Sequence, residues 1–310
     1  MTVNNLEDFD GLSEAILAVT TNRTGTTQIF VVDVLSGDAH NISRDANSHN
    51  RYPMWSPDGL QLAFTSDRSR PDTYNLYLVD SQGCKVRQLT DIPQHGVCYF
   101  PTWSGSYIYF GLDSGDGSPA VIARINDNGS GYTVIGPGRD PAISPSGDTI
   151  AFTQKVSTGY CVFSMNADGT GVRQLTTHEN KIGAVTPTWS PNGRKLLYSD
   201  EVDGKLELFC CEHDGSSQKQ LTNLRQFATS PAWSPDGNFI SFRVTDHDYW
   251  NYADAKEYAY KEQKADKRPV WVMRADGSDA RILEVLHYQC AIDGSRAPWK
   301  PRGKSNENRS

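Results

Sequence analysis

The sequence lacks any run of eighteen apolar residues, so it predicts no membrane-spanning helix. Basic residues are in the minority, because 30 Lys and Arg stand against 37 Asp and Glu, and the net charge of −7 disfavours nucleic-acid binding. Residues 1–11 lack the basic start and the apolar core of a secretory signal. We therefore expect a cytoplasmic protein that binds neither nucleic acid nor a membrane.

Cysteine is scarce, and no two of the six cysteines form a Cys-x-x-Cys pair. Cys210 and Cys211 are adjacent in an apolar segment, where strand geometry would point their side chains to opposite faces. We expect most of the cysteines to be small buried residues in a reducing compartment.

What the sequence does contain is a short block that recurs six times. The clearest copies are Pro-Met-Trp-Ser-Pro-Asp-Gly at 53–59 and Pro-Ala-Trp-Ser-Pro-Asp-Gly at 231–237. Looser copies begin at Pro101, Pro141, Pro187 and Pro298, and successive copies start 48, 40, 46, 44 and 67 residues apart. A period of this length is typical of repeat architectures.

One repeat, 53–90, shows what each block contains. Short apolar runs at 53–56, 60–64, 76–79 and 86–89 alternate with turn residues, of which Pro-Asp-Gly is the most regular. Four short strands joined by tight turns predict a four-stranded antiparallel propeller blade. The Trp of the block falls on the innermost strand, and we expect it to pack between neighbouring blades.

The two ends of the chain predict how the repeats close. Residues 16–43 supply three strands with no preceding block, whereas the copy at 298–303 has no following strands. Joined, the two segments make one complete blade, which removes free sheet edges. We therefore predict an all-β fold, a closed six-bladed β-propeller over 14–303, with tails at 1–13 and 304–310.

These motifs carry a family resemblance. The block Pro-x-Trp-Ser-Pro-Asp-Gly, followed by an apolar strand, Asn-Leu-Tyr at 75–77 and Gln-Leu-Thr at 88–90, resembles the repeat of TolB-type propellers. It is also similar to the propellers of prolyl-oligopeptidase-type peptidases and of oligogalacturonate lyases, in which His and Gln residues near the channel bind a metal. The chain contains no Gly-x-Ser-x-Gly nucleophile motif of such peptidases. The resemblance implies the fold, but function on such scaffolds depends on the site.

Histidines gather in the loops that join one predicted blade to the next. Four of the seven lie there: His49, His95, His178 and His287. Imidazole is a good ligand for zinc and other divalent metals, so His49, His95 and His287, from successive blades, are candidate metal ligands at the channel mouth. The alternative is that polar loops simply accumulate histidine.

The same loops carry Arg51, Tyr99, Arg139 and Arg225, which could bind a carboxylate or phosphate. The alternative is that they are solvated loop charges or form salt bridges between blades. A second feature on this face is an insertion at 246–268, which contains His247, Tyr249 and Trp250. It predicts an aromatic lid over the channel, or a decoration packed on its own blade.

Two functions follow from these residues. The first is a binding or protein-interaction module, which uses the face of the inter-blade loops and takes a small molecule, a glycan or a protein at the channel mouth. The second is a metal- or His-dependent lyase or hydrolase with its site under the 246–268 lid. The sequence alone leaves both open.

Overall fold

The structure, a computed structural model, describes residues 16–22, 25–34, 36–177, 183–245, 269–283 and 298–301. All regular elements within these ranges are β-strands. The same ranges contain no helix with the length and apolar character needed to cross a membrane. The insertion at 246–268 lies outside them.

The strands follow one another along the chain in groups that form antiparallel sheets. The first sheet has three strands, β1 (Ile16–Thr21), β2 (Gln28–Asp33) and β3 (Ala39–Asn41). Three four-stranded sheets follow: β4 (Asn50–Trp55), β5 (Gln61–Ser66), β6 (Asn75–Asp80) and β7 (Arg87–Gln88); β8 (Val97–Ser104), β9 (Tyr107–Asp113), β10 (Val121–Asn126) and β11 (Thr133–Pro137); and β12 (Arg139–Ile143), β13 (Thr149–Val156), β14 (Gly159–Asn166) and β15 (Arg173–Gln174).

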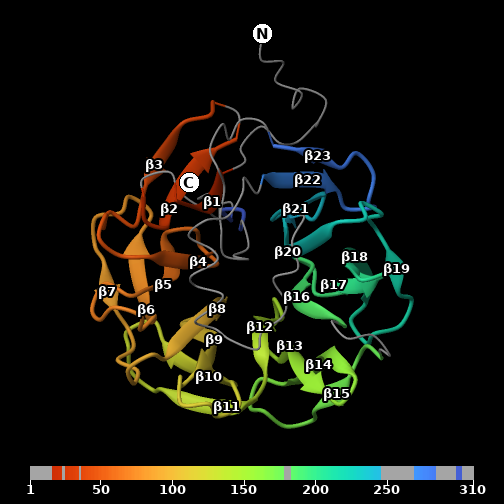
Figure 1. Cartoon of the computed structure of the whole chain (residues 1–310), viewed down its shortest axis with the longest axis horizontal. Helices are drawn as coiled ribbons and strands as arrows, with labels where there is room; N and C mark the ends of the chain where they lie inside the picture. The colour runs from red at the N-terminus through yellow and green to blue at the C-terminus, as the bar shows by residue number, and fades with distance from the viewer. Residues whose placement is uncertain are drawn as a thin grey trace, which may run out of the picture.

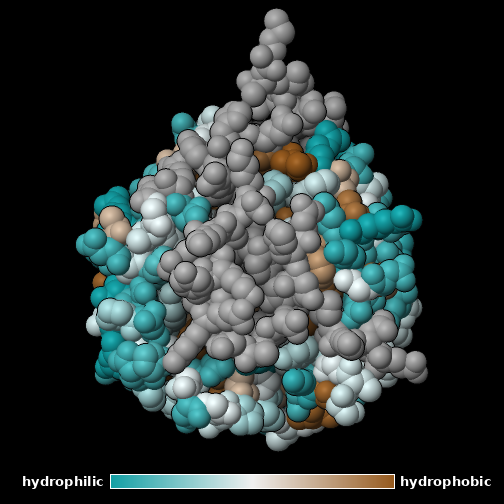
Figure 2. All heavy atoms as spheres, viewed as in Figure 1, coloured by the Kyte–Doolittle hydropathy of each residue, from teal (hydrophilic) through white to brown (hydrophobic). Residues whose placement is uncertain are grey.

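The last eight strands are linked into one sheet. They are β16 (Val185–Trp189), β17 (Lys195–Val202), β18 (Lys205–Glu212), β19 (Lys219–Gln220), β20 (Phe227–Trp233), β21 (Phe239–Thr245), β22 (Val270–Arg274) and β23 (Arg281–Ile282). A parallel contact between Leu206 and Phe227 joins the two groups of four. Figure 1 shows the sheets arranged around a common axis, with β4, β8, β12, β16 and β20 nearest the centre. This arrangement is consistent with a propeller, and the described surface at its periphery is mostly hydrophilic (Figure 2).

The Ser-Pro-Asp-Gly segment forms the turn between the first two strands of a sheet. The Ser56 hydroxyl donates to Asp58 Oδ1 at 2.6 Å and accepts the backbone N–H of Gln61 at 2.9 Å. That hydroxyl is the main reason why the pKa of Asp58 lies below its ordinary value. Gly59 has φ +69°, which suits glycine. The bonds recur at Ser234 and Asp236, so the repeated motif is a structural turn.

The Gln-Leu-Thr segment has an equally local explanation. Thr90, Thr176 and Thr222 each accept a buried backbone N–H of the neighbouring third strand at 2.9 Å. The preceding Gln side chain donates to the carbonyl of the same Thr, at 2.6–2.7 Å. Only two residues of each outermost strand pair with the third strand. The Gln-Leu-Thr segment therefore supplies further hydrogen bonds that hold the outermost strand to the third strand.

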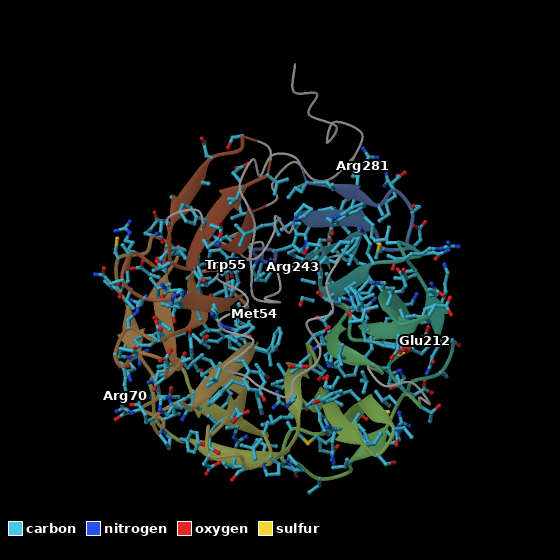
Figure 3. The ribbon with its side chains drawn as sticks, in the orientation of Figure 1. Met54, Trp55, Arg70, Glu212, Arg243 and Arg281 are labelled. Atoms are coloured by element: carbon cyan, nitrogen blue, oxygen red, sulfur yellow. The ribbon has the colours of Figure 1, made fainter. Side chains whose placement is uncertain are left out.

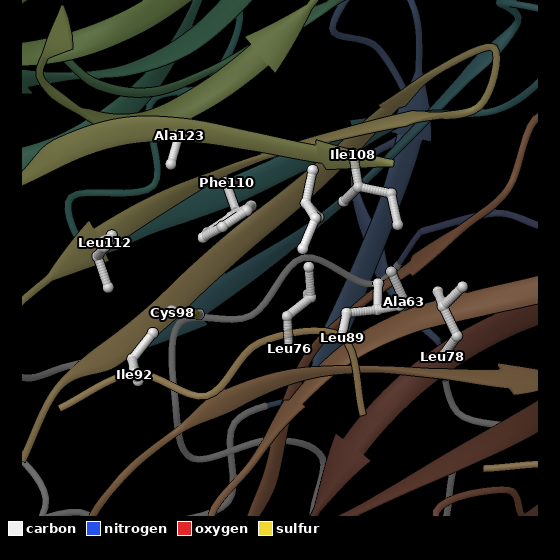
Figure 4. Close-up of a cluster of buried hydrophobic side chains, with 11 residues drawn as sticks. Ala63, Leu76, Leu78, Leu89, Ile92, Cys98, Ile108, Phe110, Leu112 and Ala123 are labelled. Atoms are coloured by element: carbon white, nitrogen blue, oxygen red, sulfur yellow. The ribbon is translucent and has the colours of Figure 1, made fainter. Parts of the chain in front are cut away.

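The motif tryptophans pack between sheets, as predicted. Trp103 Nε1 donates to the Met54 carbonyl at 3.2 Å, and Trp189 Nε1 donates to the Ala142 carbonyl at 2.9 Å, in each case on the preceding sheet. Trp55 is buried in a cluster formed by the first two sheets. The apolar cores lie between neighbouring sheets, as Figure 4 shows for the cluster that joins Leu76 and Leu78 to Ile108 and Phe110.

The two ends of the described chain contact each other at β1. Trp299 pairs with Leu17, the N–H of Ala18 donates to the Pro298 carbonyl at 3.1 Å, and the N–H of Lys300 donates to the Ile16 carbonyl at 2.7 Å. Trp299 also belongs to a buried cluster that unites β1 and β2 with β21 and β22. The C-terminal segment 298–301 therefore lies along β1, and the first sheet packs against β21 and β22.

Most of the described cysteines are buried, as expected. Cys98, Cys161, Cys210 and Cys211 are buried, and Cys84 is exposed. Burial raises the pKa of the Cys98 and Cys211 thiols to about 12, so neither is a reactive thiolate near neutral pH. Cys290 lies outside the described residues.

Candidate functional site

The innermost strands share an unusual backbone conformation at the residue before the motif proline. These residues are Tyr52, Phe100, Asp140, Thr186 and Ser230, and their φ values lie between +47° and +53°. In each strand the ladder register shifts at this point, which marks a β-bulge. A left-handed conformation costs a non-glycine residue about 1–3 kcal/mol. All five innermost strands β4, β8, β12, β16 and β20 keep it, so the bulge is a constant feature of the repeat.

A layer of paired residues lies beside these bulges. Each pair joins a residue of an innermost strand to the residue opposite it on the second strand. The pairs are Arg51 with Thr65, Tyr99 with Gly111, Arg139 with Thr153, Val185 with Ser199, and Thr229 with Arg243. In most pairs the larger residue is on the inner strand. At Gly111 the reason is steric, because a Cβ at this position would lie 2.2 Å from the Tyr99 ring, so the large inner residue requires a small partner. We call the larger residues of these pairs, Arg51, Tyr99, Arg139, Val185 and Arg243, the rim layer.

The sequence analysis missed two rim-layer residues, Val185 and Arg243, of which Arg243 is the charged one. In its pair the order is reversed, since the small Thr229 is on the inner strand and Arg243 comes from β21. Arg243 is 1% exposed. Figure 3 places it toward the middle of the ring with Met54 and Trp55, whereas Arg70, Glu212 and Arg281 lie at the periphery. An alignment of the repeats could have found it, because the other second strands carry Thr, Gly or Ser at this position.

Three aromatic rings meet at the rim between β4 and β8. The Tyr52 ring lies 4.7 Å from that of Phe100 and 6.5 Å from that of Tyr99, and the Tyr99 and Phe100 rings are perpendicular at 6.2 Å. Tyr52 is half-buried, whereas Tyr99 and Phe100 are buried. The Tyr99 hydroxyl is buried without a hydrogen-bond partner, and burial raises its pKa. We call Tyr52, Tyr99 and Phe100 the aromatic cluster.

Cationic side chains flank the aromatic cluster. The Arg139 guanidinium lies 5.8 Å from the centre of the Tyr99 ring and 3.3 Å from Asp113 Oδ2. The Arg51 guanidinium lies 4.8 Å from the centre of the Tyr74 ring, and Arg51 is 7% exposed. Arg51, Tyr99 and Arg139 therefore occupy equivalent ladder positions on three innermost strands, and a common binding site stays a prediction. Stacked guanidinium and aromatic groups suit carboxylates and apolar side chains of a ligand.

Arg225 does not belong to this layer. It is exposed in the segment before β20, and its backbone N–H donates to Glu207 Oε1 at 2.7 Å. The buried Glu207 carboxylate also accepts the Thr222 hydroxyl at 2.5 Å. Glu207 therefore holds the loop that carries Arg225.

The two described histidines of the predicted site have local structural contacts. His49 Nδ1 lies 3.1 Å from the Thr27 hydroxyl, and its backbone N–H donates to Asp67 Oδ1 at 2.7 Å. Burial raises the pKa of Asp67. His95 is exposed, and its backbone N–H donates to the Thr73 hydroxyl at 3.1 Å.

The remaining predicted residues lie outside the described part of the chain. They are His178, His247, Tyr249, Trp250 and His287. Among the residues that the structure describes, no three His, Cys, Asp or Glu side chains are grouped so that they could hold a metal ion. A metal site that includes His287 therefore stays a prediction.

Comparison with known proteins identifies similar chains. The family model described as a TolB beta propeller domain matches residues 14–237. The chain is 32% identical over 149 residues to an uncharacterized peptidase of Bacillus subtilis, YuxL, with 47% of this chain and 21% of the relative aligned. It is 31% identical over 145 residues to a TolB homolog of Chlorobium chlorochromatii, with 45% of this chain and 30% of the relative aligned. The alignments thus span less than a third of either relative.

Solved structures share the fold. TolB from Acinetobacter baumannii superimposes with a TM-score of 0.70 at 16% identity, over 94% of this chain and 67% of that one. An oligogalacturonate lyase in complex with manganese gives a TM-score of 0.52 at 11% identity, over 86% of this chain and 72% of that one. At such identities the likeness concerns the fold alone.

Proposed function

Because the chain belongs to the TolB beta propeller domain family, we propose that it is a closed six-bladed propeller that binds a protein partner. The binding face is the one on which the innermost strands begin, where the inter-blade loops enter. The rim layer and the aromatic cluster form the centre of that face.

The proposal of six blades is supported by the grouping of the strands and by the contacts of the chain ends. The eight-stranded sheet contains two groups of four whose ladders are joined by a single parallel residue pair, so we count each group as a blade. The segment 298–301 adds an innermost strand to β1–β3. The buried cluster shared by β1, β2, β21 and β22 brings the first and last blades together.

The aromatic cluster is the observation that carries the binding proposal. Tyr52 is half-buried beside two buried rings, on a backbone that the bulge holds in a left-handed conformation. Aromatic and arginine side chains are the residues most enriched at the energetic centres of protein interfaces. Arg139 lies beside the cluster, so the partner segment that fits has an apolar or aromatic residue next to a carboxylate.

The alternative of a metal- or His-dependent enzyme has less support. Its proposed ligands include His287, and the described candidates His49 and His95 make separate contacts with Thr27 and Thr73. The peptidase relative shares 21% of its own length with this chain, so its activity does not transfer to it. A protein partner requires only the surface chemistry of the rim.

A matched pair of tyrosine variants tests the proposal. The partner is first identified by crosslinking and purified, and its affinity is then measured by calorimetry. Tyr52→Ala should weaken binding at least about tenfold, as removal of an interface hot spot does. Tyr107→Ala is the control, because Tyr107 is 40% exposed at the opposite end of a sheet. Loss of binding in the Tyr107 variant, with full binding in the Tyr52 variant, would place the interface on the other face.

A further inference from the structure

Four of the outermost strands carry a cation at the same ladder position. Arg87, Arg173, Lys219 and Arg281 occupy the same ladder position in β7, β15, β19 and β23, each of which has two residues. Short edge strands with a positive charge are the usual protection of an open sheet edge.

Three of these cations also attach one blade to the next. Arg87 donates to the Asp127 carbonyl. Arg173 donates to the Asp214 carbonyl at 2.8 Å, and Lys219 lies 3.3 Å from the Asp276 carbonyl. Each of these carbonyls belongs to the turn before the outermost strand of the following blade. The same position therefore serves both solubility and the contact between blades.

The outermost strand β11 departs from this pattern. It has five residues, Thr133–Pro137, and Thr133 stands at the position of the cation. No residue between 128 and 138 is charged. Tyr132 is 49% exposed and Val134 is 50% exposed. We call Tyr132, Thr133 and Val134 the β11 edge.

The Tyr132 ring packs at this edge because the third strand of the blade has no aromatic residue beside Phe110. In the neighbouring blades the second-strand ring stacks on a third-strand ring, as Phe152 does on Phe163 at 5.8 Å. In the blade of β11 the third-strand residue is Ala123, and the Phe110 ring instead contacts Tyr132 at 6.5 Å. The ladder between β10 and β11 also has a register shift at Ile122 and Ala123.

We propose that a second copy of this chain packs on the β11 edge and forms a two-fold symmetric dimer. Two identical strands placed antiparallel are self-complementary about a two-fold axis. Two copies meeting at β7, β15, β19 or β23 would bring like charges together, whereas the β11 edge is uncharged. Since the chain has a net charge of −7, an uncharged edge is where two copies approach at the lowest electrostatic cost.

The proposed contact uses only the beginning of β11, because the next blade covers its later residues. Gly169 of the next blade lies against the Ile135 carbonyl oxygen, because a Cβ there would be 2.5 Å from it. The part of the strand that a second copy can reach is therefore the β11 edge, whose apolar residues are Tyr132 and Val134. An interface of this size forms a weak dimer that depends on concentration.

Sedimentation velocity of the full chain from micromolar to submillimolar concentration tests the proposal. The wild-type chain should change from monomer to dimer over this range. Val134→Lys should weaken association at least about tenfold, because each copy brings a positive charge into the contact. Val172→Lys is the matched control, since Val172 is 55% exposed beside β15, and it should dimerise like the wild type.

A second variant separates dimer loss from misfolding. Thr133→Arg restores the cation of the other outermost strands, and it should also abolish the dimer while the melting temperature stays at or above that of the wild type. A wild-type chain that remains monomeric throughout the range, or a Val134→Lys variant that still dimerises, would overturn the proposal. A chain that captures the strand of a different protein but never dimerises would overturn it as well.

Discussion

A single oxygen atom distinguishes Tyr198 from the residues at the same position of other second strands, Phe64, Phe110, Phe152 and Phe242. The Tyr198 side chain is fully buried, and its hydroxyl has no hydrogen-bond partner. A buried polar group without a partner costs about 1–3 kcal/mol relative to its hydrated state. The residue thus keeps the shape of the core position at a cost in stability.

We predict that Tyr198→Phe raises the free energy of unfolding by about 1 kcal/mol, because it removes an unsatisfied hydroxyl and keeps the ring stacked on Phe209. Urea denaturation measures the change. Tyr77→Phe is the control, since the Tyr77 hydroxyl donates to Gln88 Oε1 at 2.9 Å and its removal should be destabilising. Equal losses in the two variants would show that the Tyr198 hydroxyl has a partner in solution.

At the scale of an element, the Gln-Leu-Thr segment shows how a two-residue strand is held. Val162 N–H donates to the buried Thr176 hydroxyl at 2.9 Å, so the hydroxyl continues the ladder beyond the strand. We predict that Thr176→Val lowers the free energy of unfolding by about 1–3 kcal/mol, because a buried N–H loses its acceptor. Thr176→Ser keeps the acceptor and should cost less in the same urea titration. A valine variant as stable as the serine variant would contradict this role.

The turns before the outermost strands depend on pH. The hydroxyls of Thr170, Ser216 and Ser278 donate to Asp168, Asp214 and Asp276 at 2.6–2.7 Å. These bonds are the main reason why the pKa of each carboxyl lies below its ordinary value. A carboxyl whose pKa is lower in the folded than in the unfolded chain stabilises the fold above the unfolded value of about 3.9. That stabilisation is lost as the pH falls through the folded value.

We therefore predict that the combined variant Thr170→Ala, Ser216→Ala, Ser278→Ala melts below the wild type at about pH 6, where all three carboxylates are ionised. The difference in melting temperature should shrink as the pH is lowered below about 3, because protonated carboxyls no longer gain from the hydroxyls. Melting curves across this range measure it. A difference that does not change with pH would mean that the hydroxyls act only through packing.

At the scale of the whole molecule, the segment around Trp299 contacts both the first and the last described strands. Deletion of residues 296–310 removes Trp299 from the cluster of β1, β2, β21 and β22, together with its pairing to Leu17. We predict a large fall in melting temperature. Trp299→Ala should reproduce much of it, at about 3–5 kcal/mol, and Trp299→Phe should lose less because a ring remains. A truncated chain that melts like the full one would show that the ring does not need this strand.

The repeated strands and turns were predictable from the sequence because their causes are local. Ser56 bonds to Asp58 two residues away, and Thr90 bonds to the N–H of Leu76 within the same repeat. Such contacts recur wherever the motif recurs, so their positions follow from spacing alone. The sequence also predicted the burial of Trp55 and the pairing of the segment around Trp299 with the N-terminal sheet, since an incomplete repeat at each end leaves one position to fill.

The repeat, its strands and the general location of Arg51, Tyr99 and Arg139 therefore followed from the sequence. The fold established that Arg243 pairs with Thr229 between β20 and β21, whereas an alignment of the repeats indicates only that the large and the small residue are exchanged. The tertiary structure likewise decided that Tyr132 and Val134 are exposed at an uncharged edge, which depends on a register shift next to Ala123. Register and the packing of neighbouring sheets arise from contacts between residues distant in the chain, and a one-residue shift changes which side chains face solvent.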